Sequence, residues 1–161
     1  MPIEIPKDKW TGNIRAITIG ATVAEGGTRA KTVTVGGQTT MPYLQFEAPT
    51  PNKPVIAIEI KSRKPEDWSA LLVDVWGEAL ADPAQWAKKA EEAGADLVVL
   101  ALTVEDSPDD AVRVVKSVLE ATGLPLIVWG PGQAEKDNEL LVPVSEAAKG
   151  EKLVLGICED K

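Results

Sequence analysis

A strand, a helix and a second strand can be recognised in residues 94–129, which read GADLVVLALTVEDSPDDAVRVVKSVLEATGLPLIVW. Residues 97–102 and 124–129 are continuously apolar, as is typical of strands buried on both faces of a parallel sheet. Between them Ser107 can cap a helix and Pro108 suits its first position. This stretch therefore predicts a strand–helix–strand unit of an α/β protein.

The same order of helical pattern, glycine and apolar run recurs along the chain. Helical patterns end at Gly94, Gly123 and Gly150, and a short apolar run follows each glycine. Right-handed crossovers between such runs give parallel neighbours, and both a barrel-type sheet and a doubly wound open sheet produce this local pattern. The predicted strands are residues 55–60, 97–102, 124–129 and 153–157.

The helices between these strands differ in the clarity of their signals. Asp82 followed by Pro83 predicts the start of a helix that ends at Gly94. The last helical pattern, residues 134–149, contains Pro143, which predicts a kink and a split into two shorter helices.

The connection formed by residues 61–80 is too long for a minimal strand-to-helix loop. It contains Trp68 and Trp76, and five tryptophans without basic companions are better explained by core packing or an interface than by nucleic-acid stacking. We predict that this connection covers the surface or contacts a partner, with Trp68 and Trp76 as interface candidates.

The N-terminal part has a different character. Residues 14–19 and 32–35 resemble two strands joined by a loop, which predicts an antiparallel hairpin. Prolines then mark an irregular, extended passage. We predict a division into residues 1–53, the hairpin and lead-in, and residues 54–161, the strand–helix units, within one structural unit. The prolines of the passage are Pro42, Pro49, Pro51 and Pro54.

Composition excludes several classes of protein. The 161 residues carry a formal net charge of −8, and no basic patch is visible, which argues against nucleic acid and anionic membrane surfaces as partners. No stretch approaches the roughly 20 apolar residues of a membrane span, and the N-terminus lacks a signal-peptide pattern. We therefore expect a cytoplasmic protein.

Metal-binding and catalytic side chains are scarce. Cys158 is the single thiol, so it cannot form an internal disulfide, and it has no Cys or His companions to hold zinc or an iron–sulfur cluster. The chain has no His, the commonest general base near neutral pH. We assign no catalytic residue and no metal ligand.

Polar residues follow the third predicted strand, where ligands bind in barrels and open α/β sheets. The Gly130-Pro131-Gly132 loop leads into a helix start, and its alternative interpretation is a tight turn before a solvated helix. The candidates for ligand contact are Gly130, Gly132, Lys136, Asp137 and Asn138.

Two other features have both a functional and a structural interpretation. Glu59 lies near the end of the first predicted strand, with Lys61 and Arg63 beside it, and it either meets a ligand or marks where the strand leaves the core. The glycine pairs at residues 26–27 and 36–37 suit an anion-binding nest, or more simply hairpin turns.

Ordered segments over nearly the whole chain carry a family resemblance, and together they are more specific than any single glycine pair. These segments are residues 10–14, 17–22, 25–29, 33–37, 52–57, 65–68, 82–87, 94–97 and 135–139. With these segments the chain resembles the small subunit of the corrinoid iron-sulfur protein, also known as the delta subunit of the acetyl-CoA decarbonylase/synthase complex.

The resemblance implies a TIM barrel that pairs with a larger subunit, which carries an iron–sulfur cluster and most of the corrinoid-binding residues. The pair would transfer a methyl group between a methyl-pterin methyltransferase and acetyl-CoA synthase in the carbon-fixing acetyl-CoA pathway of anaerobes. Glu59 and the Gly130 loop would then face the corrinoid shared with the partner. The implied partner interface includes Thr28, Arg29, Trp68 and Trp76.

The chain is shorter than members of that family and ends after the predicted fourth strand, so we expect half of a (β/α)8 barrel. The half-barrel is then a fragment, associates with a second copy through its open face, or is completed by a separately encoded half. Two alternative functions remain. One is a pterin-binding barrel methyltransferase, with Glu59, Asp137 and Asn138 on the pterin, and the other is a structural half-barrel without activity.

Overall fold

The computed structural model describes residues 14–39 and 50–156. Four strands in this part of the chain form one parallel sheet in the order β3-β4-β5-β6, which confirms the predicted strands. Glu59 pairs with Val99, Val99 with Ile127, and Ile127 with Val154. The strands are β3 (Ala57–Lys61), β4 (Leu97–Ala101), β5 (Leu126–Trp129) and β6 (Val154–Gly156).

Helices α2 (Pro83–Glu92) and α3 (Pro108–Ala121) begin where the sequence predicts. The Asp82 carboxylate accepts a hydrogen bond from the Ala84 amide, and the Ser107 hydroxyl accepts one from the Asp110 amide. Each cap satisfies an amide that has no partner within its own helix, which explains why these dipeptides set the helix starts.

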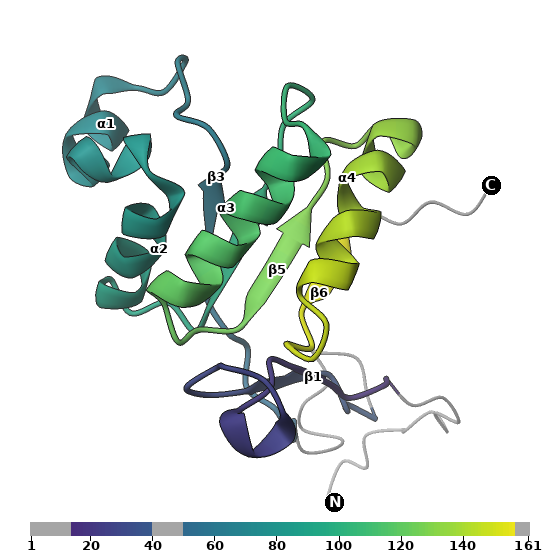
Figure 1. The fold of residues 1–161 in the computed structure, drawn as a ribbon. Helices are drawn as coiled ribbons and strands as arrows, with labels where there is room; N and C mark the ends of the chain where they lie inside the picture. The colour runs from purple at the N-terminus through teal and green to yellow at the C-terminus, as the bar shows by residue number, and fades with distance from the viewer. Residues whose placement is uncertain (1–13, 40–49, 157–161) are drawn as a thin grey trace, which may run out of the picture. The chain divides into compact units, whose positions relative to one another are not determined.

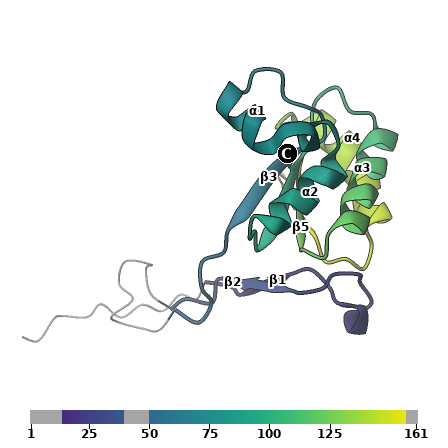
Figure 2. The same cartoon turned by 90° about the vertical axis from the view of Figure 1, so that its left-hand side faces the viewer.

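The helices cover one face of the sheet (Figures 1 and 2). Alternate strand residues on that face, among them Ile60, Leu100 and Val128, are completely buried beneath them. Strands that follow chain order with helices on one side are typical of a barrel wall, whereas a doubly wound sheet reverses its order and covers both faces. The α/β class with parallel strands is confirmed, and the described residues do not show closure into a barrel.

The predicted split of the last helix is wrong. α4 (Ala134–Ala147) is one continuous helix that contains Pro143. Loss of one backbone hydrogen bond and the ring clash cost about 3 kcal/mol, whereas each fully buried Leu or Val contributes about 1.5–3 kcal/mol. Leu140, Leu141 and Val144 are all buried on this helix, so packing on both sides of the proline outweighs its cost.

The long connection after β3 contains structure that the sequence did not predict. It forms helix α1 (Ala70–Trp76), followed by the 3₁₀ helix η3 (Gly77–Ala81). Trp68 and Trp76 are half-buried and pack against Trp86 of α2, with ring centroids 5.3 and 6.0 Å away. The tryptophans of the connection therefore anchor it to the core.

The predicted N-terminal hairpin is confirmed as a two-stranded antiparallel sheet of β1 (Ile17–Ile19) and β2 (Val33–Val35). The hydroxyls of Thr18 and Thr34 are hydrogen-bonded across it at 2.8 Å. A short 3₁₀ helix, η1 (Val23–Glu25), lies in the connecting loop. A Cβ at Gly27 would overlap the Ala21 carbonyl, so close backbone approach accounts for this glycine.

Contacts group the described residues into two compact units. Residues 14–18, 34–39 and 50–55 form one, and residues 19–33 and 56–156 form the other. The loop between β1 and β2 thus belongs to the same unit as the parallel sheet. The division at residues 53 and 54 stays a prediction.

Asp110 at the start of α3 gives a test of the cap. The Arg113 guanidinium, 2.6 Å away, and the Ser107 hydroxyl lower the pKa of Asp110 from its ordinary 3.8 to about 2. Because the folded-state pKa is depressed, the carboxylate stabilises the protein fully above pH 3.8, and this contribution is lost as the pH falls through about 2.

Carbon-detected NMR titration should therefore give Asp110 a midpoint near pH 2, and the Arg113→Ala variant should move it toward 3.8. A midpoint near 3.8 in the unmodified chain would show that the ion pair and the cap do not form.

Candidate functional site at the carboxyl ends of the strands

The parallel strands end on the same side of the sheet, where their following loops form a continuous border that we call the rim (Figure 1). The rim comprises the last residue of each strand and the loop that follows it, which are residues 61–64 at the end of β3, 101–106 at the end of β4 and 129–132 at the end of β5. Open α/β sheets and barrels bind ligands at this end.

Asp106 organises the rim between β3 and β4. Its carboxylate is 3% exposed and accepts hydrogen bonds from the Ser62 hydroxyl at 2.5 Å and the Thr103 amide at 2.8 Å. The Arg63 guanidinium donates a third bond at 2.8 Å and neutralises the buried charge. These three bonds tie the two loops together, so Asp106 is a structural carboxylate.

The rim after β5 brings three predicted site residues together. The buried Asp137 carboxylate accepts a hydrogen bond from the Gly132 amide at 3.1 Å. A Cβ at Gly130 would run into the same carboxylate, and the Gly130 amide donates to the Gly156 carbonyl at 2.8 Å. Asp137 therefore fixes the loop from α4, while Gly130 leaves room for it.

The other predicted contact residues lie apart from this loop. Lys136 is half-buried and pairs with Glu139 along α4 at 3.1 Å, and Asn138 is exposed on the same helix. Glu59 is exposed on β3, on the face opposite the helices. It is separated from β5 by β4, which places it about 10 Å away at two strand spacings.

Trp129 is a rim residue for which the sequence predicts only the end of a strand. It is 42% exposed, and because Val128 points into the helix-covered core, Trp129 points to the opposite face. A Cβ at Gly156 would lie 2.9 Å from Trp129 Cδ1, so the indole lies on the Gly156 backbone. Ala101 is its strand partner on the other side. The sequence signal that could have identified Trp129 is an aromatic residue at the end of an apolar run.

A pocket of about 620 Å³ lies beside Asp106. The buried Thr103 hydroxyl that borders it has no hydrogen-bond partner in the part of the chain that the structure describes. Unpartnered buried atoms of this kind usually meet a ligand or water, and Thr103 is one of the residues that line the pocket. Its lining includes Lys61, Ser62, Arg63, Lys64, Thr103 and Glu105.

Arg29, one of the predicted interface residues, is 3% exposed. Its guanidinium donates to the Thr122 and Leu124 carbonyls at 2.7 and 3.2 Å and pairs with Glu151 at 3.0 Å. Thr28 is exposed and donates to the same carboxylate at 2.9 Å. Arg29 thus clamps the β1–β2 loop onto the end of α3, and a role in partner contact stays a prediction for both residues.

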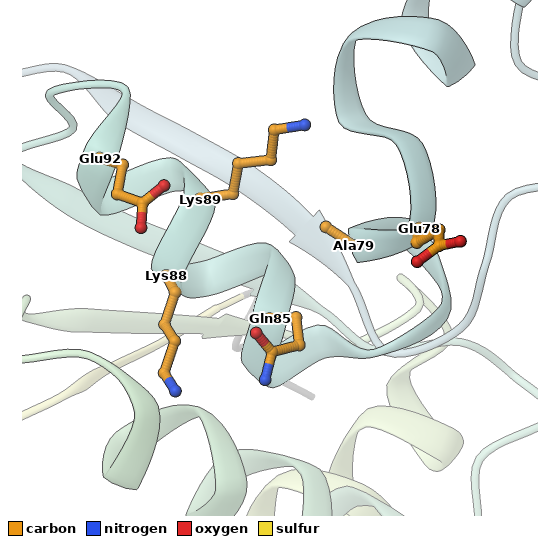
Figure 3. Close-up of a pocket in the computed structure, with 6 residues that line it drawn as sticks. All are labelled: Glu78, Ala79, Gln85, Lys88, Lys89 and Glu92. Carbon is orange, nitrogen blue, oxygen red and sulfur yellow. The ribbon is translucent and has the colours of Figure 1, made fainter.

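The side chains that line a second pocket, between η3 and α2, do not point toward a common centre (Figure 3). Lys88 and Lys89 point to opposite sides of α2, and the Glu78 carboxylate points away from both. The Lys89 ammonium already has a partner within the protein, because it donates a hydrogen bond to the Trp76 carbonyl at 3.0 Å. The rim is therefore the better candidate site.

Metal ligands do not gather within residues 14–39 and 50–156, where no three His, Cys, Asp or Glu side chains are placed to hold an ion. Cys158 lies outside the described residues. Among the helices described, none has the length and apolar character needed to cross a membrane.

A family model described as CO dehydrogenase/acetyl-CoA synthase delta subunit matches residues 16–159. The acetyl-CoA decarbonylase/synthase complex subunit delta of Archaeoglobus fulgidus is 40% identical over 156 residues, covering 92% of this chain and 34% of the relative. The acetyl-CoA decarbonylase/synthase complex subunit delta 1 of Methanosarcina thermophila is 33% identical over 154 residues, covering 91% of this chain and 35% of that relative. The chain thus spans about a third of the length of these curated relatives.

Proposed function

The chain belongs to the CO dehydrogenase/acetyl-CoA synthase delta subunit family, and on that basis we propose that it is a docking subunit of a corrinoid-dependent methyl-transfer complex in the acetyl-CoA pathway. It binds a large subunit that carries the corrinoid and an iron–sulfur cluster. It helps a methyl group pass between a methyl-pterin methyltransferase and acetyl-CoA synthase. The observation that carries this proposal is the family match over residues 16–159.

We propose further that the sheet is part of a barrel wall. The sequential strand order and the helices on one face support this, because a barrel places every helix outside and fills its interior with side chains from alternate strands. The face without helices presents Glu59, Val99 and Ile127 in one paired row. Four further strand–helix units, in a longer chain or in a separate one, would enclose this row.

The rim has a donor set that fits the border of a corrinoid, which is a large flat ring with amide side chains. The Trp129 indole offers an exposed apolar surface, and the unpartnered Thr103 hydroxyl offers a hydrogen bond to an amide. Trp129 and Thr103, together with the Gly130 loop, would hold and orient the ring and keep water from it. When bound, the corrinoid supplies the cobalt centre that carries methyl groups.

Co-expression with a corrinoid-loaded large subunit tests the proposal. The chain, with any further part of its reading frame, should co-elute with that subunit in size-exclusion chromatography and raise the rate of methyl transfer to acetyl-CoA synthase. Separate elution together with an unchanged rate would overturn it. Heat of binding with methyltetrahydrofolate alone would favour the pterin-binding alternative, and a homodimer indifferent to both ligands would favour the structural one.

A further inference from the structure

Helix α1 is apolar on nearly all sides. Val73 and Trp76 are half-buried against the core, yet Leu71, Leu72 and Val75 on the outer side are 78, 44 and 63% exposed. A helix that is apolar all round is normally covered all round. We call the three exposed side chains the α1 patch.

Contacts on the inner side of α1 hold the helix, and with it the α1 patch, in place. Trp76 packs against Trp86, which is completely buried in α2. The Lys89 ammonium donates to the Val75 and Trp76 carbonyls, where a positive charge satisfies the last carbonyls of the helix and complements its dipole. Because its inner side is fixed by these contacts, the helix presents a preformed surface.

The charges near the α1 patch are mostly acidic, with the Lys89 ammonium at the end of α1 as a cation among them. Residues 65–87 contain no Lys or Arg and five acidic residues, all of which are exposed. A second copy of this chain would place acidic groups against acidic groups, which opposes association, and the whole chain carries a net charge of −8. The five are Glu66, Asp67, Asp74, Glu78 and Asp82.

We propose that the α1 patch docks onto an apolar surface bordered by Lys and Arg on a different subunit of the complex. This inference rests on the proposed function, because it needs the chain to be an assembled subunit. The apolar centre with a charged border has the anatomy of a protein interface, in which buried apolar anchors contribute most of the affinity and border charges guide association.

Two glutamate variants test the inference in the co-expressed complex. Val75→Glu places a charge in the centre of the α1 patch, and Val142→Glu is its matched control on α4, where Val142 is 59% exposed. Measured by calorimetry with the large subunit, Val75→Glu should weaken the Kd at least tenfold, and Val142→Glu should change it less than twofold. Binding of the unmodified chain should weaken as salt is raised from 50 to 500 mM, by the screening of border charges.

A photo-crosslinking residue at position 71 gives a second measurement in the same complex. It should label a Lys- or Arg-rich segment of another subunit. Labelling of a second copy of this chain, or equal Kd values for the two glutamate variants, would overturn the inference and leave the proposed function standing. If the unmodified chain binds no subunit, the proposed function fails and the inference fails with it.

Discussion

Arg29→Met is expected to lower the free energy of unfolding by about 3–5 kcal/mol, because it breaks a buried ion pair by removing one partner. The Arg29 side chain is 1% exposed, and its guanidinium lies 3.0 Å from the Glu151 carboxylate, whose side chain is 12% exposed. The variant leaves that charge uncompensated and removes the donors to the Thr122 and Leu124 carbonyls. Urea denaturation followed by circular dichroism measures the loss.

Lys31→Ala is the matched control for Arg29→Met. Lys31 and Asp96 form an ion pair in the same part of the chain, but their charged atoms are 4.0 Å apart and both side chains are more than 40% exposed. Exposed pairs of this kind contribute about 0–1 kcal/mol. If the two variants lose the same stability, the Arg29 clamp does not exist in solution.

The helix starts and the parallel strands could be predicted because their signals are local. Asp82-Pro83 and Ser107-Pro108 satisfy helix amides within a few residues, and a continuous apolar run reports burial on both faces wherever it occurs. Pro143 was misjudged because the local cost of a proline is visible in a sequence, whereas the burial of Leu140 and Val144 around it is a tertiary property.

Helix α1 and the role of Arg29 had no such local signal. The sequence ALLVDVW is apolar on nearly all sides, so it lacks the 3.6-residue period by which a surface helix is recognised. Arg29 bonds to carbonyls more than 90 residues away in the chain. A motif such as Glu25-Gly26-Gly27-Thr28-Arg29 shows that a loop is special without showing which distant atoms it meets.

The candidate site was predictable only in part. Gly130, Gly132 and Asp137 lie within one loop and one helical turn, so their proximity follows from the sequence. Asp106 became part of the rim because β3 and β4 are neighbours, which brings Ser62 beside it from 44 residues away. Trp129 depends on strand register, which decides that it faces Gly156.

Trp86→Ala is expected to cost about 3–5 kcal/mol in unfolding free energy and to release α1. Trp86 is completely buried, and both half-buried tryptophans of the connection pack against it, Trp68 edge-on and Trp76 tilted. Removing the indole leaves a cavity beneath α1 and ends both aromatic contacts. Native-state hydrogen exchange should show the amides of residues 70–76 losing protection more than those of α3.

The Trp86→Phe variant tests how much of the effect of Trp86 comes from packing an aromatic ring and how much from its buried indole N–H. Trp86 Nε1 is buried and has no hydrogen-bond partner within residues 14–39 and 50–156, so the indole N–H is desolvated without compensation. Phe removes that group, which costs about 1–3 kcal/mol when buried and unpaired, and this gain offsets most of the lost ring area. We therefore expect the unfolding free energy of Trp86→Phe to lie within about 1 kcal/mol of that of the unmodified chain. The amides of α1 should stay protected from hydrogen exchange. Equal losses for Phe and Ala would contradict this expectation, because they would mean that a phenyl ring does not restore the packing that holds α1 in place.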